Sequence, residues 1–231
     1  MPSIIYLHGL LSSSKSQKAE VFRKTLGSFG TFYAPDFYPQ QWEFEKMTCS
    51  YLLQKLTTWV HYDNEPIILV GSSFGGLNAS RYVQKLNNDN KVVGLVLLAP
   101  ALNYLRVLEE RMNPQEWVGW EKDGFVPVHH PAWEGNSKWS YSFVEDLRLH
   151  HFPQDEIIQV PTLLIHGTSD DIIPVSNSQL FVKHQQNLGA DITAYYPEGG
   201  NHTLSNVLGL TVDLTTNFVQ QLLSSLPDNL S

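Results

Sequence analysis

The 231-residue sequence has one cysteine, no long hydrophobic run and fewer basic than acidic residues. Cys49 cannot form an internal disulfide, which excludes a fold stabilised by its own disulfides. No window reaches the apolar length that a membrane-spanning helix needs, and no basic, apolar leader follows Met1. We therefore expect a cytoplasmic protein with no stable membrane association.

The charge balance narrows the possible partners further. Lys and Arg total 15 against 23 Asp and Glu, which gives a formal net charge of -8, and the basic residues form no cluster. A phosphate backbone would be repelled by such a surface, so no nucleic-acid partner is expected. With 42% hydrophobic residues and no internal repeat or linker, residues 1–231 are expected to form a single domain with a full core.

Short apolar runs rich in branched side chains alternate with longer mixed segments along the chain. This alternation is typical of a mostly parallel sheet, here of about six strands, with helices on both faces. The predicted strands are Ser3–Leu7, Thr31–Pro35, Ile67–Val70, Val92–Leu98, Thr162–Ile165 and Asp191–Tyr196. The predicted helices are Ser16–Ser28, Phe44–Val60, Gly75–Leu86, Ser176–Asn187 and Leu204–Leu226.

A serine between two glycines follows the third predicted strand and precedes a helix. Gly71 and Gly75 flank Ser73 at two residues' distance on either side, which allows a very tight turn. Such a turn exposes a serine hydroxyl so that a carbonyl carbon can reach it. We interpret Ser73 as a nucleophile; the alternative is a glycine-rich turn with an incidental serine.

An aspartate and a histidine follow the last two predicted strands. Asp170 and His202 complete the chain order Ser, Asp, His, in which the histidine takes the serine proton and the aspartate orients the imidazole. Taken singly, Asp170 could cap a helix and His202 could be an ordinary turn residue. Their joint match with Ser73 favours a catalytic triad.

Backbone amides are expected to bind the carbonyl oxygen that becomes negatively charged. The loop after the first strand offers the amide of Leu10, and the start of the helix after Ser73 offers that of Phe74. These two N–H groups are the predicted oxyanion hole. His8 either braces this loop or simply packs at the end of the strand.

These motifs resemble the α/β-hydrolase superfamily, and the opening Tyr-Leu-His-Gly-Leu-Leu-Ser-Ser-Ser-Lys-Ser at 6–16 resembles the bacterial YqiA/YcfP-type esterases. The resemblance implies an α/β-hydrolase fold and a serine hydrolase that cleaves ester or thioester bonds without a cofactor. It covers nearly the whole chain through four motifs: Tyr-Leu-His-Gly at 6–9, Gly-x-Ser-x-Gly-Gly at 71–76, His-Gly-x-x-Asp-x-x-Ile-Pro at 166–174 and Gly-x-His at 200–202.

The interval 103–160 is too long for an ordinary connection, shows no clear strand and holds four of the six tryptophans. Because it leaves the sheet at the edge where the triad converges, we predict a cap over the active site. Asp146 either anchors this insertion or faces solvent. One hypothesis is that a cap aromatic faces the acyl group, and the alternative is that the aromatics form the cap's own core: Trp117, Trp120, Trp133, Trp139 and Tyr141.

Three functions remain open at this point. The favoured one is a carboxylic ester hydrolase that acts on a small-molecule acyl ester through an acyl-enzyme on Ser73. The same machinery could serve a thioesterase, an amidase or an acyltransferase, and a non-enzymatic ligand receptor is less consistent with a full triad. No metal is expected, because the pairs His129-His130 and His150-His151 lack the spacing of a metal site. The oligomeric state stays open.

Overall fold

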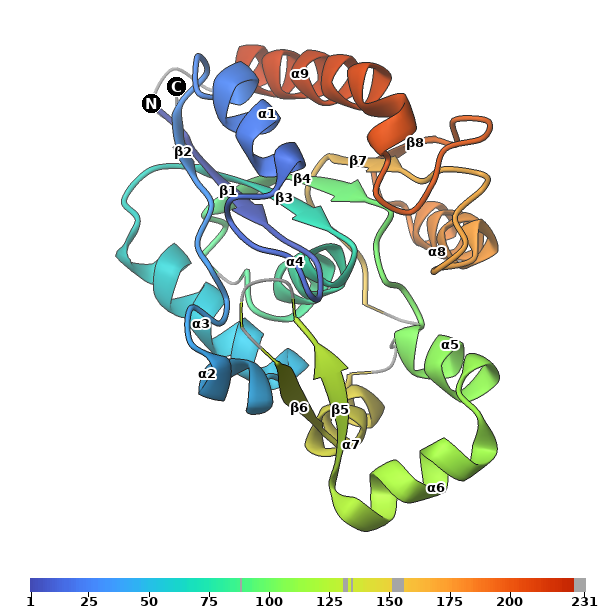
Figure 1. Ribbon diagram of the computed structural model, residues 1–231. Helices are drawn as coiled ribbons and strands as arrows, with labels where there is room; N and C mark the ends of the chain where they lie inside the picture. Colours follow the sequence, from blue (N-terminus) through green and yellow to red (C-terminus); the bar gives the residue numbers. More distant parts are fainter. Residues whose placement is uncertain (88, 131–132, 134, 151–155, 227–231) are drawn as a thin grey trace.

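The computed structural model describes residues 1–87, 89–130, 133, 135–150 and 156–226, and Figure 1 gives its course. Its strands are β1 (Ser3–Leu7), β2 (Thr31–Tyr33), β3 (Ile67–Ser72), β4 (Val92–Leu98), β5 (Phe125–His129), β6 (Asn136–Ser140), β7 (Thr162–Ile165) and β8 (Ile192–Tyr195). Its helices are α1 (Gln17–Leu26), α2 (Gln41–Glu45), α3 (Cys49–Tyr62), α4 (Phe74–Lys85), α5 (Tyr104–Arg111), α6 (Pro114–Asp123), α7 (Ser142–Leu149), α8 (Val175–Asn187) and α9 (Leu208–Ser225), with a 3₁₀ turn η1 (Ser205–Val207) before α9.

Six parallel strands form the main sheet, in the order β2-β1-β3-β4-β7-β8. Strands β1, β3 and β4 are almost wholly buried, because branched apolar residues fill both faces of each. The strand order reverses direction between β1 and β3, and crevices open at such switch points beyond the carboxyl ends of the strands. The predicted α/β fold with about six strands is confirmed.

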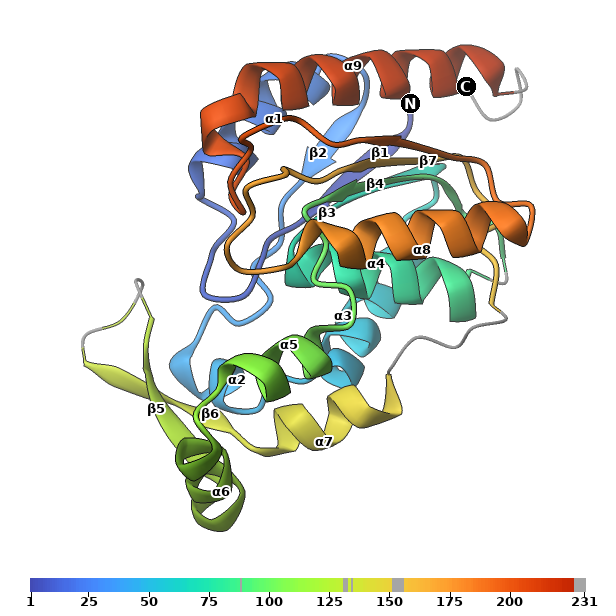
Figure 2. The same ribbon diagram turned by 90° about the vertical axis from the view of Figure 1, so that its right-hand side faces the viewer.

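Helices cover both faces of this sheet (Figure 2). Helices α1 and α9 lie on one face, where Phe22 and Val219 join a fully buried cluster with sheet residues such as Val96. Helices α3, α4 and α8 lie on the other face around a larger cluster that includes Leu52 and Leu97. The two hydrophobic clusters pack on opposite faces of the sheet and hold its strands in place. The candidate site lies at the carboxyl ends of these strands.

The predicted helix Phe44–Val60 is wrong in one respect, because the structure divides this segment into α2 and α3. The Thr48 side chain accepts a hydrogen bond from the Tyr51 backbone N–H at 3.0 Å and thus caps the start of α3. The apolar spacing runs through the break without interruption, which is why it suggested a continuous helix.

The long interval 103–160 contains α5, α6, α7 and an antiparallel β5–β6 hairpin, so the expectation of no strand there is wrong. Phe125 pairs with Ser140 in this hairpin, and alternate residues of β5 are exposed. Asp146 anchors the insertion, since its Oδ2 accepts the Ser50 backbone N–H at 2.9 Å and joins α7 to the start of α3.

None of the helices within the described ranges has the length and apolar character to cross a membrane.

Candidate active site

Four loops that follow the carboxyl ends of strands bring the predicted site residues together. Leu10 follows β1, Ser73 follows β3, Asp170 follows β7 and His202 follows β8. Because all four strands are parallel, their carboxyl ends lie at one edge of the sheet. Chain segments far apart in sequence therefore meet beside the β1/β3 switch point.

Ser73 occupies a sharp turn between β3 and α4. Its φ of 52° and ψ of -116° lie outside the usual regions for a residue with a side chain, a strain of about 1 to 3 kcal/mol. The turn is held at both sides, since Ser73 N donates to Leu98 O at 2.9 Å and Ala101 N donates to Ser73 O at 2.9 Å.

The flanking glycines are required by close backbone contacts, as the sequence predicted. A Cβ on Gly71 would lie 2.6 Å from the Gly75 carbonyl oxygen, and one on Gly75 would overlap the carbonyl oxygens of Leu7 and His8. A carbon and an oxygen atom that are not bonded cannot approach this closely. The start of α4 can therefore pack directly against the end of β1 only if residue 75 is glycine.

Ser73, His202 and Asp170 form one chain of hydrogen bonds. His202 Nε2 lies 2.9 Å from Ser73 Oγ, and His202 Nδ1 lies 2.7 Å from Asp170 Oδ2. The Asp170 carboxylate can only accept, so Nδ1–H donates to it and the lone pair of Nε2 faces the serine hydroxyl. The imidazole is thus oriented to remove the Ser73 proton.

The Asp170 carboxylate is saturated with donors. Its Oδ1 accepts the backbone N–H groups of Ile172 and Ile173 at 2.9 and 2.8 Å, and His166 Nε2 lies 2.9 Å from Oδ2. Burial by itself would raise the pKa of Asp170, but the hydrogen bonds from His166 and His202 outweigh it and hold the pKa well below 3.8. Asp170 is therefore a carboxylate at neutral pH.

His166 is a site residue that the sequence reasoning missed. Its side chain is fully buried, with Nδ1 at 2.7 Å from Ser178 Oγ while Nε2 donates to Asp170. The signal was present in the His-Gly-x-x-Asp pattern, where His166 directly follows β7, but an apolar strand gives no reason to place the next side chain against the carboxylate.

The loops that carry Asp170 and His202 touch through a second pair of glycines. A Cβ on Gly167 would overlap the backbone of Gly200, and Ser169 N donates to Gly200 O at 3.0 Å. This direct contact fixes the separation of the two loops and hence of the acid and the histidine.

The loop after β1 presents its backbone to Ser73. A Cβ on Gly9 would lie 3.1 Å from Ser73 Cβ, so the loop passes directly beside the nucleophile. Among the described residues, the backbone N–H groups of Leu10 and Phe74 donate to no protein acceptor and remain available to a ligand oxygen. Both predicted donors thus lie in segments adjoining Ser73.

His8 both packs at the end of β1 and braces the loop. Its Nε2 accepts the Phe37 backbone N–H at 3.2 Å, so Nδ1 carries the proton and donates to Gly9 O at 2.9 Å. Burial lowers the pKa of His8, which keeps the imidazole in this neutral form.

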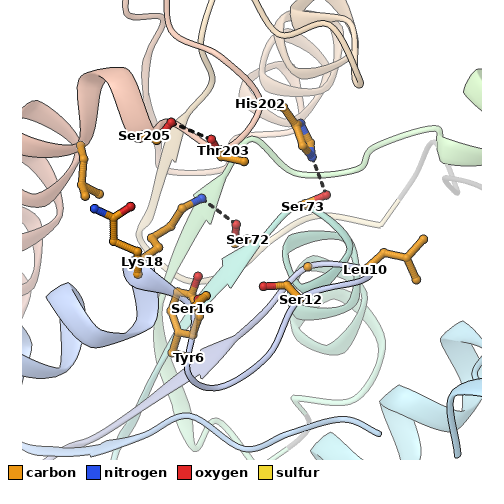
Figure 3. A pocket seen from close by; sticks show the side chains of 13 residues that line it. Tyr6, Leu10, Ser12, Ser16, Lys18, Ser72, Ser73, His202, Thr203 and Ser205 are labelled. Carbon is orange, nitrogen blue, oxygen red and sulfur yellow. Dashed lines mark hydrogen bonds between the residues drawn. The ribbon is translucent and has the colours of Figure 1, made fainter. Parts of the chain in front are cut away.

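A cavity of about 410 Å³ opens beside Ser73 and His202 (Figure 3). Lys18, from the first turn of α1, extends along it and donates from Nζ to Ser72 Oγ at 2.9 Å. Sequence reasoning missed Lys18, because nothing local distinguishes it from a solvated lysine. The cavity is lined by Tyr6, Gly9, Leu10, Ser12, Ser16, Gln17, Lys18, Ser72, Ser73, His202, Thr203, Ser205 and Leu208.

The aromatics of the insertion pack mainly on one another. Trp120 is fully buried, with ring centroids 4.9 Å from Trp139 and 5.8 Å from Tyr141, and Trp117 completes the cluster. Trp133 stacks on His130 at 3.9 Å instead. No described residue of 103–160 lines the cavity beside Ser73, so the geometry favours a self-supporting core over a substrate-facing aromatic.

One histidine of each pair contacts a neighbouring side chain. His130 packs on Trp133, and His150 Nε2 lies 2.8 Å from Ser50 Oγ. Within the described ranges, no group of three or more His, Cys, Asp or Glu side chains could hold a metal ion. His151 lies outside the described residues.

Comparison with known proteins adds to this geometry. The profile of the uncharacterised protein family UPF0227 matches residues 3–210. Palmitoyl-protein thioesterase ABHD10, mitochondrial, from Bos taurus is 27% identical over 180 residues, which are 75% of this chain but only 58% of that protein. The chain thus spans little more than half the length of this curated relative.

Solved structures give the same fold. A candidate hydrolase from Agrobacterium vitis S4 aligns with a TM-score of 0.80 and 25% identity over 96% of this chain and 87% of its own. Alpha/beta hydrolase domain-containing protein 10 from mouse aligns with a TM-score of 0.77 and 21% identity over 95% of this chain and 90% of its own. Both confirm the predicted α/β-hydrolase fold.

Proposed function

The chain belongs to the UPF0227 family, the YqiA-type group within the α/β-hydrolase superfamily, and from this premise we propose that it is a carboxylic ester hydrolase. The observation that carries the proposal is the unbroken series of hydrogen bonds from Ser73 through His202 to Asp170, beside two available backbone amides. A hydrolase is the function that its relatives support.

In the first half-reaction, Ser73 Oγ attacks the ester carbonyl carbon while its proton passes to His202 Nε2. The carbonyl oxygen becomes an oxyanion that the amides of Leu10 and Phe74 bind, each contributing about 3 kcal/mol to the stability of the transition state. Asp170 stabilises the imidazolium that forms. The C–O bond to the leaving group then breaks, and His202 returns the proton to the departing oxygen.

Water resolves the acyl-enzyme in the second half-reaction. His202 removes a proton from the water, whose oxygen attacks the acyl carbon, and the same two amides bind the second oxyanion. The bond to Ser73 Oγ then breaks, the proton returns to Ser73 and the carboxylic acid leaves. No step calls for a metal or a cofactor.

Thioester hydrolysis is the second candidate, and a specific comparison favours it. The bovine relative is a palmitoyl-protein thioesterase by its name. Ser73 can attack the carbonyl carbon of a thioester with the same geometry as that of an ester, and a thiolate leaving group needs a proton from His202 less than an alkoxide does.

We also propose that residues 103–160 act as a cap at the site, because Tyr104 and Phe143 pack on Phe74.

A fluorophosphonate probe followed by peptide mapping tests the proposal. Labelling is expected on Ser73, and Ser73→Ala should lower turnover of p-nitrophenyl butyrate by about 10⁴- to 10⁶-fold while the thermal unfolding temperature stays close to that of the wild type. Comparison of butyryl esters with butyryl thioesters separates the two candidates. An adduct on Ser72, or none at all, would refute the assignment.

A further inference from the structure

Most of the residues that line the cavity beside Ser73 are polar, and apolar atoms contribute the larger part of its surface. Hydroxyl groups line it from both sides: Ser12 and Ser16 from the β1–α1 segment, and Thr203 and Ser205 from the loop after His202. Acyl chains prefer pockets lined by apolar side chains. The hydroxyl groups on this wall can in addition bind a small polar group.

Lys18 adds a positive charge to this polar wall. Its Nζ donates one hydrogen bond to Ser72, and an ammonium has three N–H donors. Among the described residues, Lys18 forms no ion pair with a carboxylate. Asp170 attracts it only at longer range, and that carboxylate is already held by His166 and His202.

Burial makes this charge unusual. Desolvation lowers the pKa of Lys18 to about 8, so the ammonium still predominates near neutral pH but lacks the hydration that a surface lysine has. The α1 helix also begins at the cavity with Gln17, and its positive N-terminal end adds to the field. A partly desolvated ammonium beside hydroxyl donors is a strong site for an anionic oxygen group.

The position of the cavity assigns it to one side of the reaction. Thr203 and Ser205 follow His202 in the chain, so the cavity extends along the loop that carries the general acid. His202 Nε2 delivers its proton to the departing oxygen. The group that leaves the acyl carbon on the His202 side can therefore depart into the cavity that Lys18 also lines (Figure 3).

We propose that Lys18 selects esters or thioesters whose small leaving group carries a carboxylate or a phosphate. This inference rests on the proposed hydrolase function and adds the chemistry of its substrate. Lys18 is a specificity residue here, because it contacts the leaving group and takes no part in bond making or breaking.

Matched esters and matched lysine variants test this assignment. The substrates are 4-(butyryloxy)benzoate, its neutral methyl ester and 4-(butyryloxy)phenyl phosphate. The variants are Lys18→Met and Lys24→Met, since Lys24 is exposed on the same helix and its loss changes the net charge equally. For each variant, kcat/KM for an anionic ester is divided by kcat/KM for the neutral ester, and this ratio is compared between variants. The intrinsic reactivity of each ester is the same for all variants and therefore cancels in the comparison.

We expect Lys18→Met to lower this ratio by about 10- to 100-fold, because a charge-assisted hydrogen bond is lost. Lys24→Met should leave the ratio at the wild-type value. An unchanged ratio in Lys18→Met, with neutral ester still cleaved, would overturn the assignment of Lys18 and leave the hydrolase proposal standing. If the wild type cleaves no ester and takes no fluorophosphonate label, both proposals fall together.

Two further measurements address the side of the site and the folding of the variant. Mono-p-nitrophenyl succinate carries its carboxylate in the acyl part; a loss confined to this ester would place the anion on the acyl side and refute the leaving-group assignment. On the wild type alone, 4-hydroxybenzoate should slow fluorophosphonate labelling at lower concentrations than 4-hydroxybenzamide. Equal protection by the two compounds would contradict an anion site at Lys18 even if Lys18→Met does not fold.

Discussion

Asp170 and Asp171 are neighbours in one loop, yet only Asp170 has its side chain buried against His166 and His202. We expect Asp170→Asn to lower kcat by about 10⁴-fold, because an amide cannot hold the imidazole in the tautomer that accepts the Ser73 proton. Asp171→Asn, whose side chain is exposed, is the matched control and should have little effect. Steady-state kinetics on a p-nitrophenyl ester would measure both, and a large loss at Asp171 alone would reverse the assignment.

The ionised Asp170 carboxylate should also stabilise the fold in a pH-dependent way. Its pKa lies below the unfolded value of 3.8, so its stabilisation is fully present above about pH 5. The stabilisation is lost as the pH falls through 3.8 toward the folded pKa.

Thermal unfolding of the wild type and Asp170→Asn between pH 7 and pH 3 would measure this contribution. The advantage of the wild type should be largest near pH 7 and should shrink below about pH 4. An advantage that grows on acidification would mean that Asp170 is protonated in the folded protein.

Among the contacts between helices and strands, the contact of β1 with α4 depends most on the absence of a side chain at Gly75. Gly75→Ala would drive a Cβ into the carbonyl oxygens of Leu7 and His8, and rigid backbone on both sides cannot move away. We expect a loss of about 3 kcal/mol or more in the free energy of unfolding, measured by urea denaturation.

Gly119 provides the matched control, since a Cβ there would meet nothing within 4 Å in the middle of α6. Gly119→Ala should raise the free energy of unfolding by about 0.5 to 1 kcal/mol, because alanine favours a helix. A Gly75→Ala variant as stable as the wild type would show that α4 can shift away from β1 at little cost.

The sequence predicted the sheet better than it predicted the breaks between elements. Strands β1, β4 and β7 match their expected ranges, because branched apolar runs are a direct consequence of burial on both faces. Thr48, by contrast, caps the start of α3 through a hydrogen bond that apolar spacing does not indicate. The β5–β6 hairpin was missed because its strands are half exposed and β5 contains Pro127, a residue that is unusual within a strand.

The same division applies to the candidate site. Ser73, Asp170 and His202 could be found from motifs, because a tight turn and two strand ends leave local signs in the chain. Lys18 could not, since its partner Ser72 lies 54 residues away and only the packing of α1 on the sheet joins them.

At the scale of the whole molecule, the contribution of the insertion 103–160 to folding stability can be measured separately from its contribution to substrate selection. Trp120 is fully buried, and its Nε1 donates to Trp139 O at 2.8 Å. Trp120→Ala should lower stability by about 3 to 5 kcal/mol by emptying the centre of this small core.

Because Trp120 does not line the cavity beside Ser73, its loss should not alter chain-length selection. The ratio of kcat/KM for octanoate and butyrate esters is therefore expected to stay within about twofold of the wild type, below the effect of one methylene contact. A larger change in that ratio, in protein shown to be folded, would restore the hypothesis that a cap aromatic contacts the acyl group.

The hydrogen bond between Ser73 and His202 joins residues 129 apart in the sequence. Closing so long a loop has an entropic cost that local contacts do not have, and chains rich in such contacts fold slowly. During refolding, helix content should therefore recover before reactivity toward a fluorophosphonate does. Until β8 has formed and brought His202 to Ser73, the serine has no base to remove its proton and is unreactive. Catalytic activity is therefore expected to appear as the last step of folding.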